Sequence, residues 1–183
     1  MKDRKGFTLI ELILTLSISS LIFLTLISVL KFTVNSYKLG EMEDELILNG
    51  KYVVEFIKKE IRSADKIISS DKIEFLHEEF GENVGFVVMK YNNPGEYYKY
   101  NYSTYYLKDN KIIRVAANTN DEKLPRAGMF RGYNEVAEHI VSIEGTKADF
   151  SKRTIDLNIT LGDRDGMSTK FSTTIFIRCP VLY

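Results

Sequence analysis

The pattern of apolar and polar positions divides the chain into an apolar N-terminal run, a stretch with helical periodicity, and a series of short runs separated by turn residues. From Phe7 to Leu30 the single charged residue is Glu11, and this run of about 24 residues exceeds the roughly 20 that a helix needs to cross a bilayer core. We therefore predict a transmembrane helix at residues 7–30. Because a carboxylate inside such a helix costs on the order of 2.5–3.5 kcal/mol, Glu11 is expected to have a partner.

Beyond this run, apolar residues recur at steps of three and four and at sums of these steps. The spacing predicts that the helix continues through residues 31–64 with one apolar face against a domain. No proline precedes Pro94, so nothing forces a sharp break in the helix. The charged outer face is either solvated surface or a means of electrostatic registration against adjacent subunits. The apolar face consists of Leu39, Met42, Leu46, Val53, Ile57 and Ile61, widened by Val54 and Phe56; the outer face consists of Lys51, Glu55, Lys58, Lys59 and Arg62.

Short apolar or alternating runs after Asp65 predict an antiparallel sheet within one domain, residues 65–183. The fold class is therefore predicted to be α+β: a long N-terminal helix, with a membrane half and an amphipathic half, packed on an antiparallel β-sheet domain. One hairpin is expected to turn at Lys108–Lys111 and a second at Gly162–Gly166. The expected strands are Lys72–Leu76, Val84–Tyr91, Tyr97–Leu107, Lys111–Ala116, Thr154–Leu161 and Lys170–Arg178.

Two segments between these strands lack a strand pattern. Asn118–Tyr133 contains Pro125, Gly128 and Gly132 and is predicted to be a long loop. Glu135–Ile140 is predicted to form a helical turn.

Charge is distributed unevenly across the predicted membrane helix. Lys2, Arg4 and Lys5 precede it with only Asp3 opposing them, and acidic residues follow it at positions 41 and 43–45. The positive-inside rule places the N-terminus in the cytoplasm and the globular domain outside the cytoplasmic membrane. The chain as a whole has 25 basic and 25 acidic residues, which argues against a general polyanion-binding domain.

The residues around this boundary, Lys5-Gly6-Phe7-Thr8-Leu9-Ile10-Glu11-Leu12, resemble the N-terminal motif of the type IV prepilin family, which includes the pseudopilins. The resemblance implies that a prepilin peptidase removes the cytoplasmic leader, residues 1–6, by cutting between Gly6 and Phe7, and methylates the new amino group of Phe7. It also implies that Glu11 neutralises the positive N-terminus of a neighbouring subunit during filament assembly.

Within this pilin-like family, the order of elements looks most like a J-type minor pseudopilin or a related type IV minor pilin. The matching patterns are the helix end Glu60–Ala64, the Tyr-Tyr-Leu hairpin followed by Arg114, the run Ile140–Ile143 and a last strand that ends at Arg178. The resemblance implies other major and minor pilin subunits, an assembly platform protein and membrane lipid as partners. It implies a place at the cell surface or in a pseudopilus after assembly.

Other classes of N-terminal segment fit less well. A secretory signal peptide has an apolar core of about 7–15 residues and a small-residue cleavage site, which this longer run lacks. A signal-anchored adhesin or sensor remains an alternative, and Glu11 has no role in such a protein. Within the prepilin family, a competence pseudopilus component for DNA uptake is the other interpretation.

A cluster of tyrosines is the main candidate for a further binding surface. Tyr98, Tyr100 and Tyr102 alternate and would share one face of a strand. Such a face either belongs to a core or subunit interface, or stacks the bases of single-stranded nucleic acid or sugars. Basic residues do not flank it densely, which favours the first interpretation.

The remaining candidates for chemistry are isolated. Asp163 and Asp165 resemble a fragment of a calcium loop, but Arg164 lies between them and a hairpin turn explains the same residues. Cys179 is the only cysteine, so no internal disulfide forms. His77 and His139 stand alone, and no catalytic motif is present. We therefore expect neither an enzyme nor a cofactor.

Overall fold

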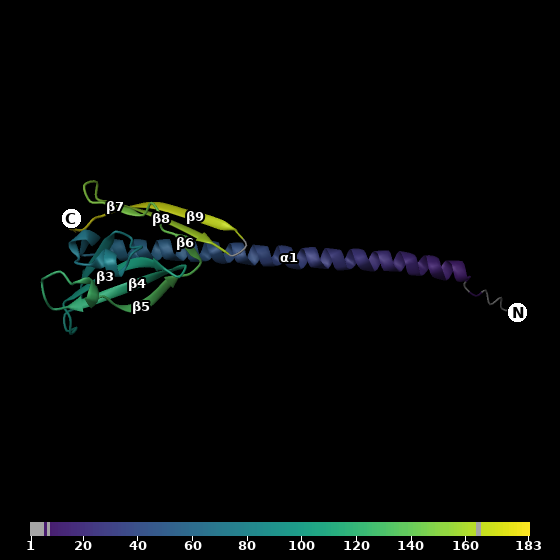
Figure 1. Cartoon of the computed structure of the whole chain (residues 1–183), viewed down its shortest axis with the longest axis horizontal. Helices are drawn as coiled ribbons and strands as arrows, with labels where there is room; N and C mark the ends of the chain where they lie inside the picture. The colour runs from purple at the N-terminus through teal and green to yellow at the C-terminus, as the bar shows by residue number, and fades with distance from the viewer. Residues whose placement is uncertain (1–5, 7, 164–165) are drawn as a thin grey trace. The chain divides into compact units, whose positions relative to one another are not determined.

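The computed structural model of the chain describes Gly6, residues 8–163 and residues 166–183. The chain divides into two compact units, Met1–Glu43 and Asp44–Tyr183. One helix, α1 (Leu9–Arg62), contributes residues to both units (Figure 1). A long N-terminal helix is thus confirmed, and the apolar run and the amphipathic stretch belong to the same 54-residue element.

In the first unit, α1 carries large apolar side chains on all sides up to Leu30. Its large apolar side chains from Leu9 to Phe32 are exposed, from 44% at Ile27 to 79% at Leu9. The helix is long enough and apolar enough to cross a membrane. Six of its hydroxyl groups donate hydrogen bonds to backbone carbonyls three or four residues earlier, as Thr15 does to Leu12 and Ser17 to Ile13. These polar groups are therefore satisfied within the helix, which suits a helix surrounded by lipid.

The second unit contains two β-sheets. In the larger sheet, here sheet A, the strand order is β10-β1-β2-β3-β4-β5, with β10 parallel to β1 and the other pairs antiparallel. In the smaller sheet, sheet B, β8 pairs antiparallel with β6, β7 and β9. The strands are β1 (Lys66–Ser69), β2 (Phe86–Tyr91), β3 (Tyr100–Lys108), β4 (Lys111–Thr119), β5 (Arg131–Ala137), β6 (Ile140–Ser142), β7 (Lys147–Asp149), β8 (Thr154–Gly162), β9 (Ser168–Phe176) and β10 (Val181–Leu182).

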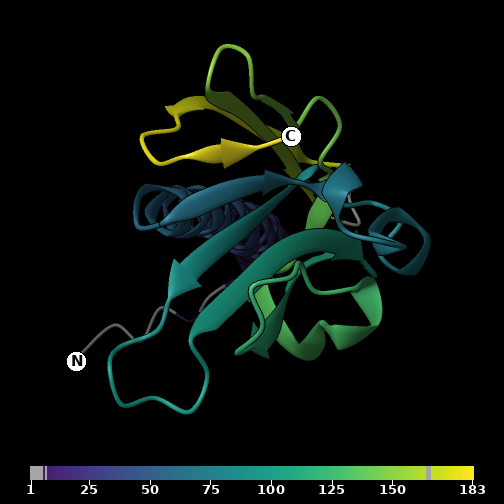
Figure 2. The same ribbon diagram turned by 90° about the vertical axis from the view of Figure 1, so that its left-hand side faces the viewer.

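The main core of this unit lies between the two sheets and one face of α1. Figures 1 and 2 show the C-terminal part of α1 with sheet B on one side and sheet A on the other. Apolar residues of both sheets pack on the helix, including Ile67 and Phe86 from sheet A and Leu157 from sheet B. The helix contributes Leu46, Val53, Ile57 and Ile61, each at most 2% exposed.

A second core covers the opposite face of sheet A. Here Ile68, Val87 and Ile113 pack with residues of the short helices α2 (Leu76–Glu79) and η2 (Ala127–Met129) and with Ile73, which follows the short helix η1 (Ser70–Lys72). Sheet A is therefore buried on both faces. This burial explains why β1 and β2 have continuous rather than alternating apolar residues.

Both predicted hairpins are confirmed. β3 pairs with β4 through Asp109 and Asn110, whose φ angles of 50° and 60° are those of a type I′ turn. β8 pairs with β9 from Thr154↔Phe176 to Gly162↔Ser168. The fold class predicted from the sequence, α+β with a long helix on a mainly antiparallel sheet, is likewise confirmed.

Three local predictions were wrong. Lys72–Leu76 is not a strand: it joins η1 to α2, and the first strand is instead Lys66–Ser69. Glu135–Ile140 is not a helical turn, because β5 continues to Ala137 as the edge strand next to β4. The predicted loop Asn118–Tyr133 contains η2, and β5 begins within it at Arg131.

The apolar face of α1 is shorter than the sequence indicated. Leu39 is 50% exposed, and burial begins at Leu46. Gly50 belongs to the buried face, where the ring of Phe171 from β9 lies against its backbone. A Cβ atom at this position would overlap that ring, so any larger residue would displace the Phe171 side chain.

We predict that Gly50→Ala destabilises the second unit although alanine favours the helix. The gain in helix propensity is about 1 kcal/mol, whereas displacing a packed side chain typically costs about 1–3 kcal/mol. Thermal unfolding of the full chain in detergent should show a lower midpoint, and Phe171→Ala in the same chain should restore part of the loss. Gly40→Ala is the control, since no atom lies within 4 Å of the point that its Cβ atom would occupy. A midpoint for Gly50→Ala that equals or exceeds the control would contradict the packing described.

Candidate functional site

The first candidate site is the beginning of α1, where Thr8 and Glu11 form a capping box. The backbone N–H of Thr8 donates to Oε2 of Glu11 at 2.9 Å, and the Thr8 hydroxyl donates to the same oxygen at 2.8 Å. In return, the backbone N–H of Glu11 donates to the Thr8 hydroxyl oxygen at 3.3 Å. The reciprocal bonds satisfy donors that a helix end otherwise leaves without partners.

The capping box fixes where α1 begins and how the carboxylate of Glu11 is held. A negative charge in the first turn also interacts favourably with the helix dipole. Among the described residues, none donates a hydrogen bond to the second carboxylate oxygen, Oε1. Glu11 can therefore keep its hydrogen bonds to Thr8 and still receive a cation from outside the chain.

The sequence contained the signal for this arrangement, but the prediction missed it. Thr8-Leu9-Ile10-Glu11 is the Thr-x-x-Glu pattern of a capping box. Thr8 is therefore added to the candidate site. Gly6 is exposed, with no atom within 4 Å of the position of a side chain. Phe7 lies outside the described residues, as does most of the leader, residues 1–5.

A second polar group lies where α1 ends against sheet A. Oε1 of Glu60 is 2.7 Å from Nζ of Lys90 on β2, and Oε2 of Glu60 is 3.5 Å from Nη2 of Arg114 on β4. The side chain of Glu60 is 18% exposed. Glu60 and Arg114 both belong to the patterns noted in the sequence, and the fold brings them together.

The same group borders the aromatic core. Tyr105 is fully buried beneath it, and burial raises the pKa of its phenol well above the ordinary value. Phe56 of α1 meets Tyr105 edge to face, with ring centroids 6.3 Å apart. The group therefore fixes the end of α1 on sheet A, and we assign it a structural role.

The tyrosine cluster does not form a single exposed face. Tyr102 is buried in the second core, and Tyr100 packs against that core. Tyr98 precedes β3 and is 41% exposed. Tyr102 is thus a core residue, as one of the two interpretations held. Tyr98, Tyr100 and Tyr102 do not form one exposed binding surface, although their spacing alternates.

Asp163 and His77, two of the residues considered as metal ligands, have other partners. Oδ1 of Asp163 accepts a hydrogen bond from the backbone N–H of Met167, which helps to close the β8–β9 turn. Asp165 lies outside the described residues. Nε2 of His77 lies 3.0 Å from Oδ1 of Asp71. The calcium interpretation therefore gains no support from Asp163.

One group of possible metal ligands does occur in the part of the chain that the structure describes. Glu45, Glu138 and His139 place one ligand atom each within 4.8 Å of one another. Nε2 of His139 is 3.6 Å from Oε1 of Glu45, and Oε2 of Glu138 is 3.7 Å from Nζ of Lys111. The Lys111 ammonium opposes a metal ion at this position, and its contact with Glu138 is an ion pair.

Cys179 is partly buried after the last strand of sheet B. This burial raises the pKa of its thiol, which lowers the fraction present as the nucleophilic thiolate. Its carbonyl oxygen accepts a hydrogen bond from Arg153 at 2.6 Å. The residue therefore behaves as a small packing residue.

We predict that Glu60→Gln lowers the stability of the second unit by roughly 1–3 kcal/mol, because it leaves the charges of Lys90 and Arg114 partly buried without their anion. Glu55→Gln is a matched control on the same helix: Glu55 is 66% exposed in its side chain and pairs with Lys58, and exposed pairs contribute about 0–1 kcal/mol. Denaturant unfolding of the full chain in detergent measures both changes. Equal effects of the two substitutions would show that the Glu60 group does not fix the helix end.

The comparisons with known proteins bear on the beginning of the chain. The model of the family described as the prokaryotic N-terminal methylation motif matches residues 1–27. No curated protein and no solved structure matches the chain. The motif implies processing by a prepilin peptidase and assembly with other pilin subunits, and its family is generally structural and non-catalytic. With its long apolar helix, the chain fits a single-pass inner-membrane anchor. The methylation motif at residues 1–27, together with a long helix packed on a mainly antiparallel β-sheet domain, supports the type IV prepilin and pseudopilin family.

Proposed function

We propose that this chain is a minor prepilin or pseudopilin that acts by assembly and not by catalysis. The peptidase cuts between Gly6 and Phe7, the new N-terminus of Phe7 is methylated, and the subunit enters a type IV pilus or a type II secretion-like pseudopilus. The observation that carries the proposal is a single carboxylate, Glu11, at the beginning of a helix whose large apolar side chains from Leu9 to Leu30 are all exposed.

The proposed role of Glu11 follows from the physical chemistry of charges in lipid. A lone carboxylate inside a membrane helix costs on the order of 2.5–3.5 kcal/mol, and an ion pair in hydrocarbon is favourable only when its geometry is close. The amino group of a neighbouring subunit at Oε1 of Glu11 would supply such a pair while Thr8 holds Oε2. A subunit added out of register would leave both charges without partners.

The minor role is proposed from the continuity of α1. The chain has no proline before Pro94, and α1 runs from Leu9 to Arg62 without interruption. Major pilins of this family commonly have a proline that kinks or melts the membrane half of the helix. We therefore propose a place in the tip or initiating complex of a filament, with other pilin subunits, an assembly platform protein and membrane lipid as partners.

The subunit would be stored in the cytoplasmic membrane with its N-terminus inside and its β-domain outside. The basic residues at positions 2, 4 and 5 support this orientation. After assembly the β-domain would stand at the cell surface or in the periplasmic or cell-wall space, where it would contact neighbouring subunits or cargo.

We predict that Glu11→Ala abolishes incorporation into filaments, with at least about a tenfold loss in the sheared filament fraction, because the loss of one close ion pair exceeds about 1.4 kcal/mol. The full chain should remain in the membrane at normal levels and remain a substrate of the peptidase. Thr8→Ala removes the cap but keeps the charge, and a cap contributes about 0.5–2 kcal/mol, so it should reduce incorporation less. Glu55→Ala serves as a control on the exposed face of the same helix.

Immunoblots of membrane and filament fractions measure these variants. Incorporation of Glu11→Ala at the natural level would refute the assembly role of the carboxylate and favour a signal-anchored surface protein.

A further inference from the structure

The face of sheet B that points away from the main core is almost entirely polar. Along β8, Ile155, Leu157 and Ile159 are fully buried in the core, so the alternate residues Asp156 and Asn158 point to the opposite face. The strand register places Thr174 of β9 opposite Asp156, and Ser172 opposite Asn158. Sheet B is thus apolar on its inner face and polar on its outer face.

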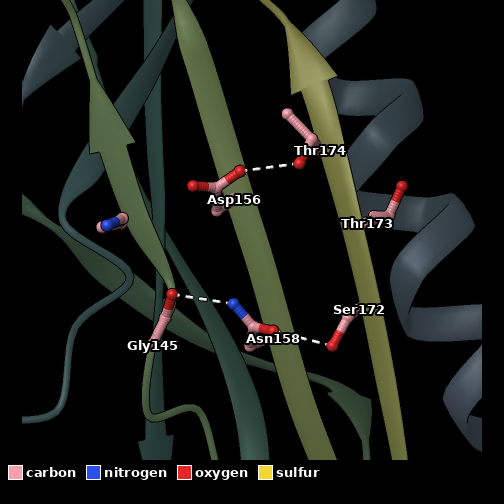
Figure 3. Close-up of a pocket in the computed structure, with 7 residues that line it drawn as sticks. Gly145, Asp156, Asn158, Ser172, Thr173 and Thr174 are labelled. Carbon is pink, nitrogen blue, oxygen red and sulfur yellow. Dashed lines mark hydrogen bonds between the residues drawn. The ribbon is translucent and has the colours of Figure 1, made fainter.

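This outer face contains a pocket of about 470 Å³. Figure 3 shows Asp156 and Asn158 on the central strand, flanked by Gly145 on one side and by Ser172 and Thr174 on the other. The lining residues are Gly145, Lys147, Asp156, Asn158, Ser172, Thr173 and Thr174.

Hydrogen bonds hold these polar groups in fixed positions. The Asn158 amide donates to the Gly145 carbonyl oxygen at 2.8 Å, and its oxygen accepts from the Ser172 hydroxyl at 2.7 Å. The Thr174 hydroxyl donates to Oδ1 of Asp156 at 2.7 Å. Because these side chains are already ordered, a ligand that binds them pays little of the entropy of fixing rotamers.

Several hydrogen-bonding groups in the pocket remain available. Lys147 is opposite Asp156 in the β7–β8 register, yet no ion pair joins them in the described part of the chain. Oδ2 of Asp156 accepts no hydrogen bond from a described residue, and each hydroxyl can accept further bonds. The pocket therefore offers both hydrogen-bond donors and hydrogen-bond acceptors, charged and neutral, within one shallow surface.

An aromatic residue outside the pocket lining belongs to the same face of the sheet. Phe176 is 70% exposed and is two residues from Thr174 on β9, so strand alternation places both on the same face. An exposed phenylalanine on a polar sheet face has an electron-rich ring available to the C–H groups of a ligand.

We propose that the outer face of β7, β8 and β9 binds a glycan. Sugar hydroxyls both donate and accept, which matches an amide, a carboxylate, an ammonium and hydroxyls fixed in one pocket, while the C–H face of a sugar ring stacks on Phe176. A single carboxylate in the pocket does not suit calcium, which takes six to eight oxygen ligands. A single lysine does not suit the repeated phosphates of nucleic acid.

Titration calorimetry of the full chain tests this proposal, with chitotetraose, cellotetraose and maltotetraose as the probes. The protein is kept in an amine-oxide detergent, because a maltoside detergent would itself present sugar. We expect at least one tetrasaccharide to bind saturably. Asp156→Ala and Phe176→Ala should each weaken that binding about tenfold, through loss of a charged hydrogen-bonding group and of the stacking ring.

Thr160→Ala is the matched control, since Thr160 lies on the same face of β8 but does not line the pocket. It should bind with unchanged affinity. Phe176 is largely exposed, so its replacement leaves the fold intact, and circular dichroism checks this.

The proposal fails if no tetrasaccharide binds saturably up to about 10 mM, a range that covers weak single-site affinities. It also fails if Asp156→Ala and Phe176→Ala bind as tightly as Thr160→Ala, or if oligothymidylate binds the pocket in place of the sugars.

Discussion

The apolar helix surface that begins at Leu9 is the constraint on which the biology of this chain depends. No described residue covers the side chains between Leu9 and Phe32, which remain 44–79% exposed. At about 25 cal/mol for each Å² of apolar surface, such a helix is stable only when lipid or other helices surround it. Storage in a membrane and assembly with like helices are the two ways to meet this requirement, and the prepilin family uses both.

Because of Glu11, the helix does not have the same free energy in lipid as in a bundle of like helices. Among the described residues, those that bond the carboxylate in lipid are limited to Thr8 of its capping box. In a bundle of like helices it could gain a cation as well, so the charge that raises the cost of storage would also favour the assembled state. The capping box explains how the carboxylate can be held in place before a partner arrives.

In the second unit, the β-domain is held rigidly on the C-terminal part of α1. The face of α1 from Leu46 to Ile61 fills the space between two sheets, and Gly50 lets β9 approach closely. Glu60 then ties the end of the helix to β2 and β4 through charged contacts. Movement of this part of the helix would therefore be transmitted to both sheets.

Much of this arrangement could be predicted from the sequence. The helix followed from uninterrupted apolar periodicity, and the β3–β4 hairpin followed from Asp109-Asn110, a pair that tolerates positive φ. β1 was missed because Ile67 and Ile68 are both buried, one on each face of sheet A, which removes the alternation of a half-buried strand. β5 was missed because its first five residues are exposed on an edge, where no apolar pattern is required.

The candidate site was predictable in its residues but not in its geometry. The motif pointed to Gly6, Phe7 and Glu11, whereas the contribution of Thr8 required the pattern to be recognised as a helix cap. The pairing of Glu60 with Lys90 and Arg114 could not be foreseen, because it depends on the register of strands far apart in the sequence.

The most direct test of the central claim is the intact mass and N-terminal sequence of the chain purified from membranes of its native host, with the prepilin peptidase present and deleted. We expect a mature chain that begins at methylated Phe7 when the peptidase is present, and an unprocessed chain when it is deleted. A chain that retains Met1–Gly6 in both strains would contradict processing as a prepilin and, with it, the proposed assembly function.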